Sequence, residues 1–140
     1  MSHSYFFEIE GRFQLFKVVS LVVNHRNTFQ DFLTQLDEKA KKRILVRIVR
    51  IADNYGFETT NRELLKYLAS YGVWEIKLHN PGCRILCCPY EDCLILLNGF
   101  EKRSDKARKQ TRAAYQKGSD FVKMLLENED VTKEKLEQAR

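Results

Sequence analysis

Basic side chains that could bind and cleave a phosphodiester occur between positions 77 and 109. Lys77, His79 and Arg84 lie in apolar, strand-like runs, where packing gives no reason for a charge. Lys and Arg can stabilise the charge on a phosphorane, and a guanidinium fork matches phosphate oxygens. The candidate catalytic residues are therefore Arg84, Lys77 and Lys102, and the candidate RNA-binding residues are His79, Arg103, Lys106 and Lys109.

Cleavage of RNA is the chemistry that such a set could perform without a metal ion or a cofactor. The 2′-hydroxyl attacks the adjacent phosphorus, a base takes its proton, and an acid protonates the leaving 5′-oxygen. Glu75 and His79 are the candidate proton carriers, and the spacing does not choose a base between them. The same residues could instead form cross-strand ion pairs on a solvated sheet.

Three apolar runs, 73–79, 83–89 and 92–98, predict consecutive strands that position these residues. Asn80-Pro81-Gly82-Cys83 suits a type II turn, which puts His79 opposite Arg84 and Leu78 opposite Ile85. Because side chains alternate along a strand, Glu75, Lys77, His79 and Arg84 share an open face. The opposite, core face carries Trp74, Ile76, Leu78, Ile85 and Cys87, and the third strand adds Ile95 and Leu97.

Helices are predicted before and after these strands. Part of 13–23 should be a strand, followed by a helix that starts at Asn27 or Thr28 and that Thr28 can cap. A second helix is expected over 37–55, and Gly56 ends it. The second helix has a basic side of Lys39, Lys42, Arg43, Arg47 and Arg50, and a short helix is expected over 62–69. After the strands comes a basic helix that Ser104 caps and Gly118 interrupts.

The predicted fold is α+β, an antiparallel sheet with an N-terminal helical pair on one face and a basic C-terminal helix. The expected domain is 13–127, between a loosely attached extension, 1–12, and a polar tail, 128–140, that is helical or frayed. The chain has 140 residues, a length that suits one domain.

Composition narrows the class of partner. A net charge of +5 and a pI near 9.0 favour anionic partners. Glu8 and Glu10 stand where a signal peptide would be apolar, and no apolar run is long enough to span a membrane, so we expect a cytoplasmic protein. The cysteines Cys83, Cys87, Cys88 and Cys93 lie in strand-like runs, which indicates buried thiols rather than a zinc site.

Residues 73–109 resemble the RelE/HigB-type toxins of type II toxin–antitoxin systems, in particular their phage-derived branch. The likeness rests on the order and spacing of three motifs, Trp74-Glu75-Ile76-Lys77, Cys83-Arg84-Ile85-Leu86 and Asn98-Gly99-Phe100-Glu101-Lys102-Arg103-Ser104-Asp105-Lys106. Residues 16–19 and 32–33 also match the first strand and the first helix of the family. The resemblance therefore extends over about residues 13 to 125.

The resemblance implies a RelE-like fold and metal-independent cleavage of messenger RNA on the ribosome, with Arg84 as the best-matched functional residue. It also implies an antitoxin partner, often a helix-turn-helix protein. The chain departs from its relatives where it has Cys83 in place of a tyrosine and Arg108 in place of a proline. Tyr115 is expected to lie too deep in the last helix to serve as their C-terminal tyrosine.

Two other functions fit this fold. One is inhibition of DNA gyrase by a ParE-like binding protein, against which the cations Lys77, Arg84, Lys102 and Arg103 argue. The other is a catalytically inactive, phage-derived binding protein, which the departures from the family pattern favour. If the nuclease reading holds, Arg84→Ala is expected to abolish toxicity while leaving the fold intact.

Overall fold

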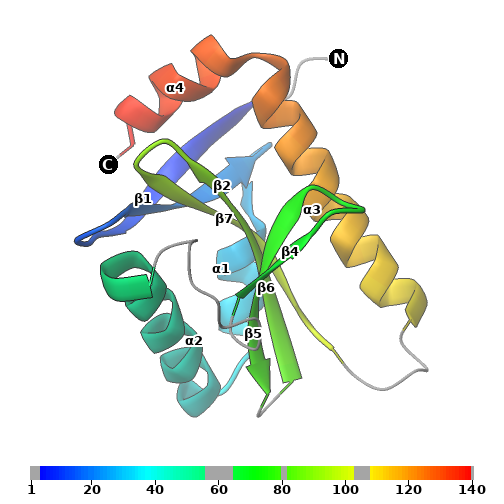
Figure 1. Ribbon diagram of the computed structural model, residues 1–140. Helices are drawn as coiled ribbons and strands as arrows, with labels where there is room; N and C mark the ends of the chain where they lie inside the picture. Colours follow the sequence, from blue (N-terminus) through cyan, green and yellow to red (C-terminus); the bar gives the residue numbers. More distant parts are fainter. Residues whose placement is uncertain (1–3, 56–64, 80–81, 103–107, 140) are drawn as a thin grey trace.

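The computed structural model describes residues 4–55, 65–79, 82–102 and 108–139, and its centre is a seven-stranded mixed sheet (Figure 1). The strand order is β1-β2-β7-β6-β5-β4, with β3 paired to β2 at the side. β2 and β7 are parallel and the other pairs are antiparallel. The strands are β1 (Tyr5–Arg12), β2 (Lys17–Val23), β3 (Arg26–Asn27), β4 (Leu65–Leu68), β5 (Val73–His79), β6 (Gly82–Tyr90) and β7 (Cys93–Glu101).

The helices confirm the predicted N-terminal pair and its place on one face of the sheet. They are α1 (Thr28–Thr34), α2 (Glu38–Arg50) with a π-helical turn at Ile51–Tyr55, α3 (Arg108–Glu127) and α4 (Glu129–Glu137). Asn27 and Asp37 cap α1 and α2 by accepting the backbone N–H three residues on. The predicted Thr28 cap is wrong, because its hydroxyl donates to the carbonyl oxygen of Leu97. No helix of the described segments has the length and apolar character to cross a membrane.

Helices cover both faces of the sheet, which divides the apolar interior into two cores (Figure 1). α1 and α2 cover the first core, which contains Ile76, Leu78 and Ile85. The second core includes Leu86, Ile95 and Leu97 from the sheet and Leu125 and Leu136 from α3 and α4. Strands buried on both faces have near-continuous apolar sequences, as the runs at 17–23 and 93–97 do.

The β5–β6 hairpin has the predicted strands in a register shifted by two residues. Lys77 lies opposite Arg84, and His79 lies opposite Gly82. A shift of two leaves every side chain on its predicted face. The predicted turn at Asn80-Pro81 lies outside the described residues.

An irregularity in the β6–β7 pairing overturns one predicted face. Leu86 pairs with Asn98 and Cys87 pairs with Leu96, so Leu97 is the extra residue of a bulge. The bulge turns Ile95 and Leu97 into the second core and brings Leu94 and Leu96 into the first.

Four further expectations about elements are wrong. Residues 5–12 are not loosely attached, because β1 pairs along its length with β2 and buries Tyr5 and Phe7. Residues 65–68 of the expected short helix form β4, an edge strand. α3 continues through Gly118, where a Cβ would lie 2.7 Å from Leu86 Cδ1. The sheet is also not wholly antiparallel. Gly56, Arg62 and Ser104 lie outside the described residues.

The polar C-terminal segment is helical, and it packs on the first strand. The Tyr5 hydroxyl and the Thr132 hydroxyl are 2.9 Å apart, and Lys17 Nζ donates to the carbonyl oxygen of Leu136 at 2.8 Å. The Lys135 ammonium lies 4.6 Å from the centre of the Tyr5 ring. α4 therefore holds β1, and through Lys17 the start of β2, by polar as well as apolar contacts.

Gly99 permits the close contact of α1 with β7. A Cβ at this position would lie 2.8 Å from Ile85 Cδ1 and closer still to the Phe32 ring. We predict that Gly99→Ala lowers the free energy of unfolding by about 1–3 kcal/mol, measured in urea, because the buried ring must shift. In the Gly99→Ala background, Phe32→Leu should cost less than it does in the wild type. Equal costs in the two backgrounds would contradict this account.

Candidate functional site

Two rows of side chains cross the end of the sheet formed by β5, β6 and β7. The outer row consists of Lys77, Arg84 and Phe100. The next row inward is Glu75, Leu86 and Asn98. Residues directly opposite one another in antiparallel strands have side chains on the same face. The prediction that Glu75, Lys77 and Arg84 share a face is therefore confirmed.

That face is not open as expected, because α3 lies across it (Figure 1). Glu75 is 2% exposed and Arg84 is 9% exposed. Two opposite charges have thus been removed from water together, an arrangement that requires each to balance the other. The expectation of an exposed cationic sheet face is wrong for these two residues.

The Arg84 guanidinium is held by Glu75 and by backbone carbonyls at the end of the hairpin. Its Nε lies 3.3 Å from Glu75 Oε1, but is not aligned for a hydrogen bond. Its Nη1 donates to the carbonyl oxygen of Cys83 at 2.9 Å and to that of Leu78 at 3.3 Å. Arg84 therefore bridges the buried carboxylate and the ends of both strands.

Tyr115 completes this buried group, although its position had been expected to exclude it. Its hydroxyl donates to Glu75 Oε1 at 2.5 Å. Its ring stacks on Tyr71, with centroids 5.2 Å apart, and meets Phe100 edge-on at the same distance. The small residues Ala114 and Gly118 beside it are the sequence signal for such a close helix, and the Ala114 carbonyl accepts a hydrogen bond from Asn98.

The environment of Tyr115 favours the neutral phenol. Burial raises the pKa of Tyr115, and the hydrogen bond to the Glu75 carboxylate and its negative charge raise it further. The Arg84 charge acts in the opposite direction and is outweighed. Tyr115 is therefore a hydrogen-bond donor to Glu75 throughout the physiological pH range.

Three of the other predicted site residues lie at the end of the hairpin or beside it. Lys77 is half-buried, and His79 is exposed at the end of β5. Lys102 is exposed, and its backbone N–H donates to the carbonyl oxygen of Gly82 at 2.9 Å. Lys109 is exposed in the first turn of α3. Arg103 and Lys106 lie outside the described residues.

The four cysteines are free, buried thiols that the sheet separates into two pairs. Cys83 and Cys87 lie in the first core, and Cys88 and Cys93 lie in the second. Burial raises the pKa of Cys88 to about 12, which keeps that thiol protonated. Within the segments described, no three His, Cys, Asp or Glu side chains are grouped to hold a metal ion.

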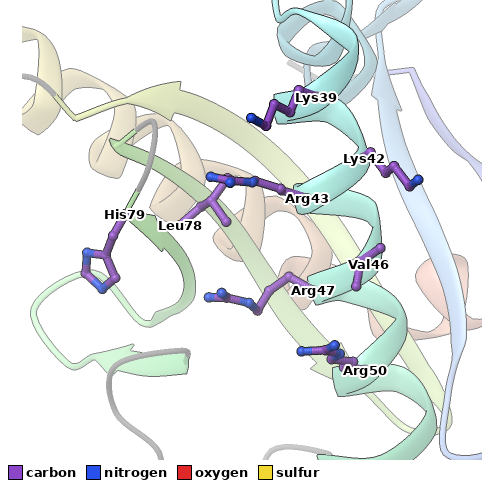
Figure 2. Close-up of a pocket in the computed structure, with 8 residues that line it drawn as sticks. All are labelled: Lys39, Lys42, Arg43, Val46, Arg47, Arg50, Leu78 and His79. Atoms are coloured by element: carbon purple, nitrogen blue, oxygen red, sulfur yellow. The ribbon is translucent and has the colours of Figure 1, made fainter.

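A separate cationic groove lies on the other face, between α2 and the end of β5 (Figure 2). Its volume is about 520 Å³. Arg47 anchors α2 there by donating from Nη1 to the carbonyl oxygen of Lys77. The groove is lined by Lys39, Lys42, Arg43, Val46, Arg47, Arg50, Leu78 and His79.

The model of the phage-derived protein Gp49-like family (DUF891) matches residues 31–117. The match extends over more than half of the chain, which therefore belongs to this family. It includes Glu75, Arg84 and Tyr115 as well as α2. No curated protein matches the chain.

Burial changes what removal of Arg84 should do. We predict that Arg84→Ala lowers the free energy of unfolding by about 3–5 kcal/mol, because it leaves the Glu75 carboxylate buried without its cation. A double variant, Arg84→Met with Glu75→Leu, should be more stable than Arg84→Ala in the same urea titration. A fully stable Arg84→Ala protein would show that Glu75 does not depend on this pair.

The raised pKa of Tyr115 predicts a change in stability at alkaline pH. Free tyrosine ionises near pH 10, so above this pH the unfolded chain loses the Tyr115 proton while the folded chain retains it. Stability should therefore fall as pH rises above about 10, and fall less steeply in Tyr115→Phe. Urea titrations between pH 8 and 11 measure the slope. Tyr67→Phe, an exposed tyrosine on β4, is the matched control and should keep the wild-type slope.

Proposed function

We propose that this chain is the toxin of a type II toxin–antitoxin system, an endoribonuclease that cleaves ribosome-bound messenger RNA in the cytoplasm. The observation that carries the proposal is the row of Lys77 and Arg84 on adjacent strands, with Tyr115 beside it, in a Gp49-like domain. The RelE/HigB-like motifs of residues 73–106 supply the reaction class.

The exposed end of the hairpin is where a phosphodiester would bind. Lys77, His79 and Lys102 lie there, and all retain solvent access. Arg84 lies directly opposite Lys77 on the neighbouring strand, so its charge can stabilise a phosphorane at this position. The buried pairing of Arg84 with Glu75 keeps the guanidinium in one orientation before the substrate arrives.

A balanced reaction follows from these groups. The 2′-hydroxyl attacks phosphorus while its proton passes to Tyr115, whose own proton passes to Glu75. The bond from phosphorus to the 5′-oxygen breaks, and protonated His79 supplies the proton to the leaving oxygen. The products are a 2′,3′-cyclic phosphate and a 5′-hydroxyl end, and water restores both proton carriers.

A catalytically inactive binding protein of the same fold is the second candidate. The observation that favours it is the burial of Arg84, which is already paired with Glu75 and with two carbonyl groups. The antitoxin that the resemblance implies is not needed for the test below, because the chain is expressed alone.

Expression of the chain alone tests the proposal. We predict growth arrest with cleaved messages that end in 2′,3′-cyclic phosphates at ribosome-bound sites, mapped by sequencing of RNA ends. Lys77→Ala and Tyr115→Phe should each lower cleavage about 100-fold, the scale of one acid–base or charge contribution. Lys66→Ala and Tyr67→Phe on β4 are the matched controls and should cleave as the wild type does.

Each alternative gives a different result. Arrest with broken DNA and intact messages would indicate the ParE-like gyrase inhibitor. Absence of arrest from a folded, well-expressed protein would indicate the inactive binding protein. Equal cleavage by Lys77→Ala and Lys66→Ala would show that the site is elsewhere.

A further inference from the structure

We infer that the outer surface of α2 is a docking site for an acidic, amphipathic helix of a partner protein. This inference does not rest on the proposed nuclease activity. The surface lies on the opposite face of the sheet from Tyr115, and it combines two grooves with an unusual mixture of charged and aliphatic side chains.

Two hollows run along α2, one on each side of its outer edge. The groove toward β5 has a volume of about 520 Å³, and the groove on the other side has a volume of about 650 Å³. Lys42, Val46 and Arg50 line both, so they form the ridge between the hollows. In Figure 2 Lys42 points away from β5, whereas Arg47 points toward it.

Aliphatic side chains are exposed at the centre of this surface. Leu45 is 43% exposed and Val46 is 41% exposed, although they lie on a helix rich in lysine and arginine. Val49, half-buried, continues the apolar strip in the second groove. Single exposed aliphatic residues are common, but adjacent ones that line two hollows give the apolar centre of an interface.

Cations form the rim of the same surface. Lys39, Lys42, Arg43 and Arg50 are all exposed, and the described acidic residue among them is Glu38 at the start of the helix. A partner that fits must therefore bring carboxylates to the rim and apolar side chains to the centre. Complementary charge of this kind accelerates association, while the apolar anchors supply most of the affinity.

The shape favours a helix over other anionic partners. α2 has 13 residues, so the hollows extend for about 20 Å, the length of a partner helix of three to four turns. A nucleic acid backbone would use the cations but not Leu45 and Val46. A second copy of this chain, docked through the same surface, would bring like charges together.

A synthetic helix tests the inference with the full-length protein. The probe is a fluorescent 18-residue peptide with leucines at helical spacing and glutamates at the flanks, compared with a scrambled peptide of the same composition. Fluorescence anisotropy is measured at several salt concentrations. We expect the ordered peptide to bind, and Leu45→Ser with Val46→Ser to raise its Kd at least tenfold. Lys39→Glu with Lys42→Glu should have a similar effect and should flatten the salt dependence.

Matched variants on α3 provide the controls. Leu126→Ser removes a leucine that is 54% exposed, and Lys117→Glu with Lys123→Glu reverses two exposed charges. Neither should change the Kd. Equal binding of the scrambled peptide, or loss of binding in the charge variants alone, would overturn the inference in favour of a general polyanion surface. Absence of binding by the ordered peptide would also overturn it. A single-stranded RNA that binds α2 more tightly than the peptide does, without dependence on Leu45 and Val46, would assign the surface to nucleic acid.

Discussion

The buried carboxylate of Glu75 is the constraint that organises the end of the sheet. A carboxylate that is 2% exposed requires a cation and hydrogen-bond donors close by. Arg84 supplies the charge from the neighbouring strand, and Tyr115 supplies a hydroxyl from α3. The position of α3 and the orientation of Arg84 on β6 therefore both depend on Glu75, which belongs to β5.

The close approach of α3 depends in turn on small residues at the point of contact. Gly118 lies over Leu86 and Asn98, where a Cβ would be 3.1 Å from the Asn98 amide oxygen. The Asn98 amide nitrogen donates to the carbonyl of Ala114, one turn earlier. Gly118 had been expected to interrupt the helix, because glycine has a low helix propensity. Here tertiary packing outweighs that propensity, and Tyr115 reaches Glu75 as a result.

Strand periodicity was sufficient to predict which candidate residues share a face. Lys77 and Arg84 lie on the predicted face even though the turn shifts the pairing by two residues, because a period of two is unchanged by such a shift. Periodicity could not reveal that α3 covers this face, since the signal lies in the contacts of distant residues. Leu94 and Leu96 alternate with Ile95 and Leu97, and the apolar character of all four was the local indication that the sheet is buried on both sides.

The pairing of strands far apart in the chain was also beyond local pattern. β1 and β4 extend the sheet at its two edges, and the parallel contact of β2 with β7 joins residues more than 70 positions apart. Such contacts are decided by which surfaces remain to be buried after the local elements have formed. Gly99, by contrast, is a signal that the sequence does carry, because a glycine within a strand marks the close approach of another element. α1 can cross β7 closely only where a side chain is absent.

The end of β5 connects the candidate site with the proposed docking surface. From one side, Arg47 of α2 donates to the carbonyl of Lys77, and the Leu78 side chain lines the cationic groove. From the other side, Arg84 donates to the carbonyl of Leu78. Two adjacent peptide groups are thus bonded to guanidinium groups that belong to different surfaces. A partner helix that moves α2 relative to β5 must therefore either break these hydrogen bonds or shift the strand to which Arg84 is bonded. The proposed docking surface thus has a direct physical connection to the candidate site.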